Sequence, residues 1–125
     1  MTEDEVGKQI VDAAIAVHRE VGPGLLESVY EAILADELER RGLDVARQVA
    51  VPVTFRGKIF DEGFRADLIV NDKVICELKA IEKVNNAHKK QLLTYLRLSG
   101  KKLGFLLNFS EALMKDGITR TVNNL

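Results

Sequence analysis

Apolar residues in the first third of the chain recur every three or four positions, the period of one face of an α-helix. This pattern predicts a first helix over residues 5–20. The tripeptide Gly-Pro-Gly at 22–24 ends it, because proline cannot continue a helix and glycine suits a tight turn. A second helix is expected from about Leu25 to Arg41, where Gly42 occupies the position of a C-terminal cap.

The apolar period changes from Ala46 onward. Alternation of apolar and polar residues predicts a strand up to Phe55, and Pro52 within it suits an edge strand or a bulge. Residues 56–58 are expected to form a hairpin turn. A second strand then covers residues 59–70, interrupted near Gly63.

The second half of the chain predicts a strand, a helix and a further buried strand. After a turn at 71–73 we expect a strand from Val74 to Ala80, and then a helix over 86–99. Three leucines of this helix should face the core: Leu92, Leu93 and Leu96. Residues 102–109 are apolar without alternation, which indicates burial on both faces of a sheet. Because this strand follows a helix, a right-handed crossover parallel to an earlier strand is expected.

A weak strand pattern at 118–122 completes the order. The elements follow one another as ααβββαβ, with a short additional strand. Residues 1–125 are therefore expected to form a single α/β domain.

The composition is that of a folded domain with a hydrophobic core. The chain has 125 residues, of which 46% are hydrophobic and 30% charged. Cys76 is the only cysteine, so no internal disulfide is expected. With no signal peptide and no apolar run of membrane-spanning length, the sequence predicts a cytoplasmic protein without membrane contact.

The net charge of -1 argues against a domain that holds nucleic acid by bulk charge alone. Four lysines nevertheless cluster in one stretch: Lys79, Lys83, Lys89 and Lys90. They could form a local basic stripe that faces phosphates, or simply a solvated helix face. Both interpretations stay open.

Charged residues interrupt two segments that are otherwise apolar enough to be interior strands: Asp67 in the second strand, and Glu77 with Lys79 in the third. An unpaired buried carboxylate is costly. Glu77 and Lys79 are two residues apart and share a strand face. A three-residue loop at 71–73 would place Asp67 opposite Glu77, whereas a two-residue loop would send them to opposite faces.

Two adjacent carboxylates repel each other, and their hard oxygens suit Mg²⁺ or Mn²⁺. Such an ion would polarise a phosphoryl oxygen and lower the pKa of a bound water. Lys79 could orient that water or stabilise charge on a phosphate. The alternative is a surface salt bridge between Glu77 and Lys79 with Asp67 exposed nearby.

Residues 24–30 read Gly-Leu-Leu-Glu-Ser-Val-Tyr, which matches the GxxExxY motif of a family of small bacterial and archaeal proteins within the PD-(D/E)XK nuclease superfamily. The chain resembles that family from Ile10 to about Val122. The resemblance implies a restriction-endonuclease-like fold, with a mixed β-sheet flanked by helices. It carries the superfamily signature onto Asp67, Glu77 and Lys79, although Ala66 stands where the superfamily name implies a proline.

The resemblance also implies roles for residues outside the sheet. Glu27 resembles the acidic residue that many such nucleases supply from the preceding helix, which makes it a third metal ligand beside Asp67 and Glu77. Its alternative is a first-turn carboxylate favoured by the helix dipole. Gln91 and Tyr95 resemble the QxxxY motif of RecB-like nucleases. Gln91 would then bond a metal-bound water or a phosphate, while Tyr95 would pack beneath the site or contact nucleic acid; alternatively, Tyr95 belongs to the core.

The implied function is hydrolysis of phosphodiester bonds in DNA or RNA, with a water bound to Mg²⁺ or Mn²⁺ as nucleophile. The catalytic set would be Glu27, Asp67, Glu77, Lys79 and Gln91. Substrate contacts would come from Tyr95, Lys83, Lys89 and Lys90. A catalytically weak or inactive nucleic-acid-binding or regulatory module, or a partner subunit with the same fold, is the alternative. The small size leaves a homodimer or a protein partner open.

Three further residues are expected to serve the structure. His18 should donate a hydrogen bond to a backbone carbonyl. Tyr30 should lie in the core with its hydroxyl bonded to a site residue or the backbone. Cys76 should be an inert buried thiol on the face opposite Glu77.

Overall fold

The structure is a computed structural model that describes residues 1–125. It contains the expected elements in the expected order, followed by the short fifth strand. Their bounds are α1 Glu3–Val21, α2 Glu27–Arg40, β1 Val45–Phe55, β2 Lys58–Val70, β3 Val74–Lys79, α3 Asn86–Ser99, β4 Leu103–Asn108, the short 3₁₀ helix η1 Met114–Gly117, and β5 Ile118–Val122.

The five strands form one mixed sheet in the order β1-β2-β3-β4-β5. Only β3 and β4 are parallel, and α3 connects them; the other neighbours are antiparallel. This confirms that the strand after α3 runs parallel to an earlier strand, as predicted. Every residue of β4 is buried, as its continuous apolar pattern predicted.

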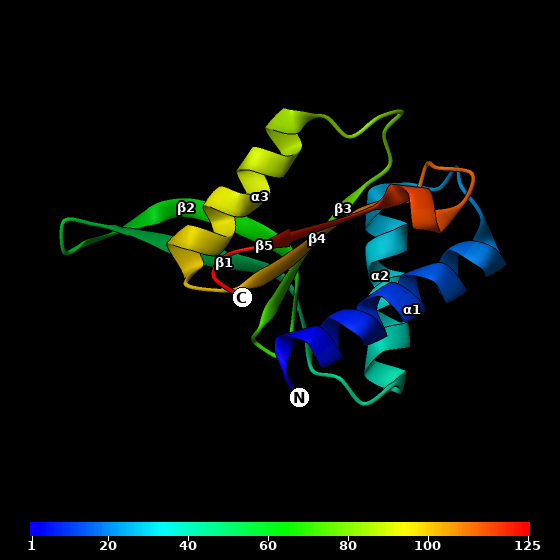
Figure 1. Cartoon of the computed structure of the whole chain (residues 1–125), viewed down its shortest axis with the longest axis horizontal. Coiled ribbons are helices and arrows are strands. Elements are labelled where there is room, and N and C mark those ends of the chain that lie inside the picture. The colour runs from blue at the N-terminus through cyan, green and yellow to red at the C-terminus, as the bar shows by residue number, and fades with distance from the viewer.

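Helices cover both faces of the sheet, with α1 and α2 on one face and α3 on the other (Figure 1). The larger core lies under α1 and α2, and the smaller core lies under α3. Leu92 and Leu96 of α3 are buried as predicted. The prediction that Leu93 faces the core is wrong in degree, since Leu93 is only half-buried.

The start of α2 is fixed by Tyr30 rather than by a capping side chain. The first helical residue is Glu27, two residues later than predicted, and its N-cap Leu26 makes no side-chain cap hydrogen bond. The Tyr30 hydroxyl donates to the Gly22 carbonyl at 2.6 Å and accepts from the Leu25 amide at 3.1 Å. The Tyr30 hydroxyl therefore bonds the backbone, one of the two predicted alternatives, and ties down the turn that precedes Glu27.

The β1–β2 hairpin lies at the sheet edge and is irregular where the sequence predicted it. The register shifts between Val51 and Val53, on either side of Pro52. Opposite this shift, a Cβ added to Gly63 would lie 1.9 Å from the Val51 carbonyl oxygen, so the close approach requires glycine. The turn has two residues rather than three, because Lys58 pairs with Phe55. Its two residues, Arg56 and Gly57, both have positive φ (50° and 76°), as a type I′ turn requires.

The loop between β2 and β3 has three residues. Val70 pairs with Val74, and the register continues through Ile69 with Ile75 and Leu68 with Cys76. This is the odd-length loop that the sequence required for Asp67 and Glu77 to lie opposite each other.

Replacing Tyr30 with phenylalanine should lower the free energy of unfolding by about 1–2 kcal/mol, because the hydroxyl bridges two backbone groups of the turn. Urea unfolding followed by circular dichroism measures the change. Tyr95→Phe is the control, since that hydroxyl bonds no backbone group. Equal free energies of unfolding for Tyr30→Phe and wild type would show that the turn before α2 does not need the Tyr30 hydroxyl.

Candidate active site

The centre of the candidate site is a fork between β2 and β3. The two strands pair only where residues 68–70 meet residues 74–76. Away from the connecting loop, β2 stays paired with β1 and β3 stays paired with β4. Asp67 and Glu77 are the first residues beyond the last pair. The Asp67 backbone N–H donates to Glu77 Oε2 at 3.0 Å, and the Leu78 N–H donates to Asp67 Oδ2 at 2.9 Å. The two carboxylates thus fill the gap where strand-to-strand hydrogen bonds stop.

An irregular residue on β1 lies beside this fork. Gln48 has a positive φ of 50°, unusual for a residue other than glycine. The side chains of β2 change faces opposite this residue: Ala66 packs in the core under α3, whereas Leu68 packs in the core under α1 and α2. Strict alternation would put both on one face. Asp67 therefore lies at the point where the strand changes face.

The carboxylate of Asp67 borders a small polar pocket on the α2 side. The pocket has a volume of about 300 Å³ and its lining contains no hydrophobic residue: Glu27, Ser28, Glu31, Gln48 and Asp67. The Gln48 amide donates to Asp67 Oδ1 at 3.2 Å and to Glu31 Oε1 at 2.5 Å. Glu27 Oε1 accepts a hydrogen bond from the Ala80 N–H at 3.1 Å, just after Lys79. The fold therefore brings Glu27 to the same pocket as Asp67.

Sequence reasoning missed Glu31 and Gln48. Glu31 is only 6% exposed and forms a salt bridge with Arg47 at 3.0 Å. It lies four residues after Glu27, on the same helical face, and that spacing was an available signal. The position of Gln48 left no such signal, because its role follows from an unusual backbone conformation.

Glu77 is almost fully enclosed, with 8% of its surface exposed. Burial raises the pKa of its carboxyl to about 8, and the negative charge of Asp67 adds to that effect. Lys79 lies two residues further on the same strand face and acts weakly in the opposite direction. Lys79 is half-buried and forms no salt bridge, so its ammonium group stays available.

Tyr95 on α3 lies near the fork. Its ring stacks on Phe64 with centroids 3.8 Å apart and planes 4° apart. Burial raises the pKa of its hydroxyl, and the charges of Glu77 and Asp67 raise it further, so the hydroxyl lies within their field. The neighbouring Gln91 acts in the opposite direction and is itself exposed. Tyr95 therefore packs partly against the smaller core and lies beside the site, while its contact with nucleic acid stays a prediction.

The three other predicted substrate-binding residues, Lys83, Lys89 and Lys90, are exposed and form no salt bridge. None of them contacts Asp67 or Glu77 through a hydrogen bond. They lie on the connection before α3 and on its first turns. His88, within this stretch, completes the α3 cap by accepting from the Asn85 N–H at 3.1 Å.

The donor set suits a hard divalent cation, although no three acidic, histidine or cysteine side chains are arranged to ligate one ion. Asp67 and Glu77 offer carboxylate oxygens in direct proximity without a paired cation. Mg²⁺ typically takes one or two protein carboxylates and keeps several waters. The residues at the fork therefore fit Mg²⁺ or Mn²⁺, with Glu27 at the border of the pocket rather than beside Glu77.

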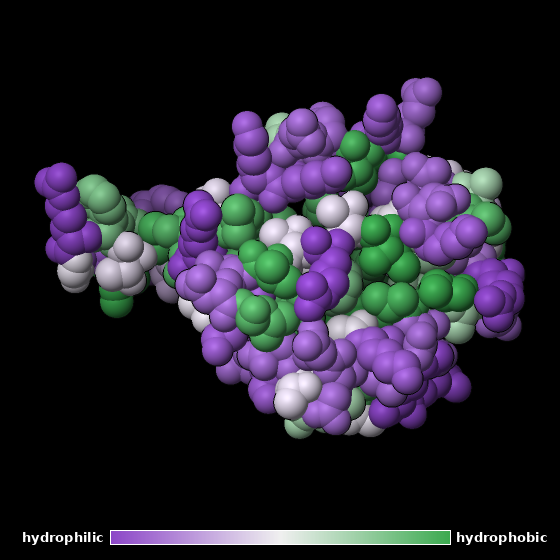
Figure 2. Space-filling view, in the orientation of Figure 1, coloured by the Kyte–Doolittle hydropathy of each residue, from purple (hydrophilic) through white to green (hydrophobic).

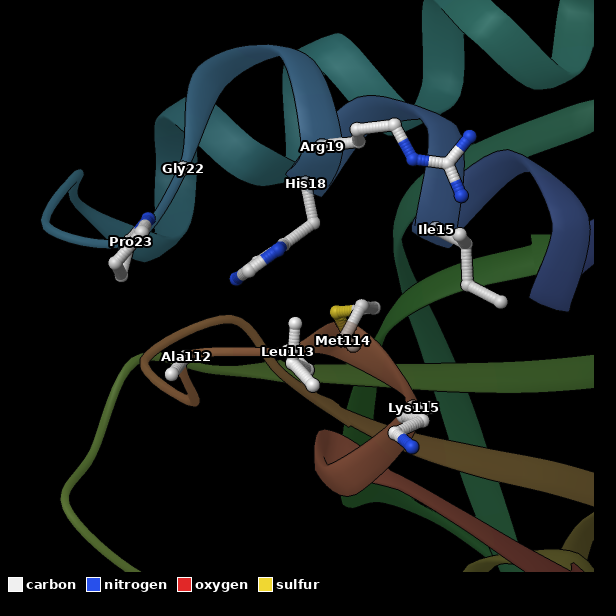
Figure 3. Close-up of a pocket in the computed structure, with 9 residues that line it drawn as sticks. All are labelled: Ile15, His18, Arg19, Gly22, Pro23, Ala112, Leu113, Met114 and Lys115. Atoms are coloured by element: carbon white, nitrogen blue, oxygen red, sulfur yellow. The ribbon is translucent and has the colours of Figure 1, made fainter.

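The largest cavity lies elsewhere, between the end of α1 and η1 (Figure 3). It has a volume of about 510 Å³, and its lining includes His18, Arg19, Met114 and Lys115 but neither Asp67 nor Glu77. His18 Nε2 donates to the Glu111 carbonyl at 2.8 Å, which confirms its predicted backbone hydrogen bond. This cavity is larger than the polar pocket beside Asp67, but the carboxylates and the lysine of the predicted active site lie at the fork.

Comparison with protein families matches residues 4–121 to the PD-(D/E)XK nuclease superfamily. The chain belongs to this superfamily, and its mixed five-stranded sheet with three helices is a restriction-endonuclease-like fold. Membership supports a nuclease-like function and implies binding of nucleic acid. No curated protein and no solved structure shows significant similarity to the chain. None of its helices is long and apolar enough to cross a membrane.

The raised pKa of Glu77 predicts how stability depends on pH. A carboxyl that binds its proton more tightly when folded stabilises the fold at low pH, and this contribution disappears as the pH rises from 4.5 through about 8. Wild type should therefore lose melting temperature relative to Glu77→Gln between pH 5 and pH 9, because glutamine stays neutral throughout. Thermal unfolding in a metal chelator measures the difference.

The exposed Glu62→Gln serves as the control for this comparison and should follow wild type at every pH. Parallel curves for wild type and Glu77→Gln would contradict the enclosed, proton-binding state of Glu77.

Proposed function

We propose that the protein is a metal-dependent phosphodiesterase that hydrolyses DNA or RNA, and that it is a member of the GxxExxY family. This proposal rests on the convergence of Asp67 and Glu77 in the fork, beside Lys79, which forms no salt bridge. Two neighbouring carboxylates that form no salt bridge, in a chain of a nuclease superfamily, are the arrangement that a catalytic cation would complete.

Asp67 and Glu77 would hold the ion, which is Mg²⁺ or Mn²⁺ by the chemistry of its oxygen ligands. Glu27 would contribute from the border of the pocket, directly or through water. A bound divalent ion would polarise a phosphoryl oxygen and make a water molecule more acidic.

The remaining residues have separate roles in this proposal. The Lys79 ammonium group stabilises negative charge that develops on the phosphate. The exposed Gln91 amide on α3 hydrogen-bonds the phosphate or the attacking water. Lys83, Lys89 and Lys90 extend the contact to neighbouring phosphates, so that local rather than net charge holds the substrate.

One observation favours a second candidate, a nucleic-acid-binding or regulatory module that keeps the nuclease fold without turnover. The acidic residues around the fork do not form a group of three suited to one ion. A protein that shifts DNA or RNA in a gel but cuts neither with any divalent ion would belong to this second class.

Asp67→Asn and Lys79→Ala should each reduce Mn²⁺-dependent cleavage by at least about 100-fold, because one removes a ligand charge and the other a group that stabilises the transition state. Cleavage of a mixture of labelled single-stranded DNA, duplex DNA and RNA measures the effect.

Asp12→Asn and Lys8→Ala remove the same charges from exposed positions on α1 and serve as matched controls. Cleavage rates that are equal in the Asp67 and Lys79 variants and in wild type would show that the fork is not the catalytic centre.

A further inference from the structure

The end of the β1–β2 hairpin, here called the arm (residues 53–60), extends beyond the body of the protein (Figures 1 and 2). It carries large apolar side chains that nothing covers: Phe55 is 58% exposed, Ile59 65% and Phe60 37%. Exposed apolar side chains that gather on one face commonly mark an interaction site.

The two phenylalanines of the arm share one face, and Ile59 lies on the other. Residues directly opposite in an antiparallel pair point to the same side. Phe55 pairs with Lys58, and Phe60 pairs with Val53, two positions before Phe55. Ile59 pairs with Thr54 and therefore points away from that face.

This face leads back to the candidate active site. Val51, two positions before Val53, pairs with Phe64, which stacks on Tyr95 of α3. The Tyr95 hydroxyl lies within the field of Glu77 and Asp67. Aromatic rings thus follow one side of the hairpin from the tip of the arm to the fork.

Each exposed ring of the arm is accompanied by a cation. The Arg56 guanidinium carbon lies 5.0 Å from the centroid of the Phe55 ring, and Lys58 Nζ lies 5.3 Å from that of Phe60. These cations are on flexible, exposed side chains, so an incoming base can replace them over the rings and leave them to bind phosphates. Asp61 and Glu62 follow directly, and the arm is therefore no basic surface that would hold a duplex by charge alone.

We propose that this face of the arm is a stacking platform for single-stranded nucleic acid, which it guides toward the fork; this rests on the proposed function, because the strand would be the substrate. Unpaired bases expose the π-faces that stack on aromatic side chains, whereas bases in a duplex are already stacked on one another. The proposal therefore selects single strands over duplex as the substrate class.

The hairpin edge is poorly suited to pairing with a second copy of the chain. Edge strands associate when they are long, flat and regular. Pro52 within β1 has no N–H to donate, the register shifts beside it, and Gln48 has a positive φ. These features argue against a dimer formed through the arm, and the experiment below includes a measurement that would detect one.

Fluorescence anisotropy of a labelled 15-nucleotide oligo(dT), in a metal chelator to prevent cleavage, tests the platform, with an oligo(U) of equal length for RNA. Phe55→Ala and Phe60→Ala should each weaken binding by at least about fivefold, the lower end of the effect of removing a stacked ring. A hairpin duplex should bind more weakly than either single strand. Ile59→Ala, on the opposite face, and Leu113→Ala, 56% exposed and far along the chain, should bind as wild type does.

The Phe55→Leu/Phe60→Leu variant separates stacking from apolar docking, because leucine keeps the apolar bulk and loses the ring face. It should bind as weakly as the alanine variants, with circular dichroism as the check on folding. Wild-type affinity in this variant, or no binding of single strands by the wild type, would overturn the platform. So would a wild-type dimer in light scattering that becomes monomeric in Phe55→Ala/Phe60→Ala.

The platform and the nuclease can fail separately. If ring variants bind and cut normally while Asp67→Asn cuts nothing, the platform is wrong and the nuclease stands. If wild type cuts nothing with Mn²⁺ and the ring variants still lose binding, the platform stands and the nuclease is wrong.

Discussion

The structure depends on how backbone N–H groups are satisfied where β2 and β3 separate. An unpaired backbone donor in a buried position costs free energy comparable to a lost hydrogen bond. Three backbone donors around the fork, on Asp67, Leu78 and Ala80, are bonded by carboxylate oxygens of Glu77, Asp67 and Glu27 respectively, and the first two of these bonds are partly buried. The acids that a nuclease would use for chemistry therefore also close the gap in the sheet, and these hydrogen bonds fix their positions.

This arrangement has an electrostatic cost that falls mainly on Glu77. It is enclosed beside a second carboxylate, and its pKa rises accordingly. A divalent cation would relieve the repulsion, which links metal binding to the same hydrogen bonds that hold the fork. The turn before α2, tied down by Tyr30, sets the position of Glu27. On the other side, the Phe64–Tyr95 stack connects the fork to the projecting arm.

Local sequence signals were sufficient to predict the elements and much of the site. The bounds of α3 agree with the predicted 86–99, because Asn85 caps its start and Gly100 takes a left-handed conformation at its end. The three-residue loop at 71–73 has the odd length that strand parity required, but the pairing of β2 and β3 ends at Leu68 and Cys76. Asp67 and Glu77 therefore meet through hydrogen bonds to backbone N–H groups and not as a pair in the strand register.

Other features were out of reach of a period-based prediction. The strand changes face beside Gln48, whose left-handed backbone conformation cannot be predicted from a glutamine in the sequence. The Gln48 amide also bonds Glu31, which lines the polar pocket. α2 starts two residues later than predicted because the Tyr30 hydroxyl bonds the Leu25 N–H and the Gly22 carbonyl and so keeps this turn out of the helix. The Tyr30 ring itself stacks on Phe109 in the core.

The most direct test of the account is to locate Mn²⁺ by its anomalous scattering in crystals of the protein soaked with that ion. We expect an ion bound by carboxylate oxygens of both Asp67 and Glu77, and its loss in Glu77→Ala. An ion bound only elsewhere, for example between Glu27 and Glu31, or no ion at saturating Mn²⁺, would contradict it.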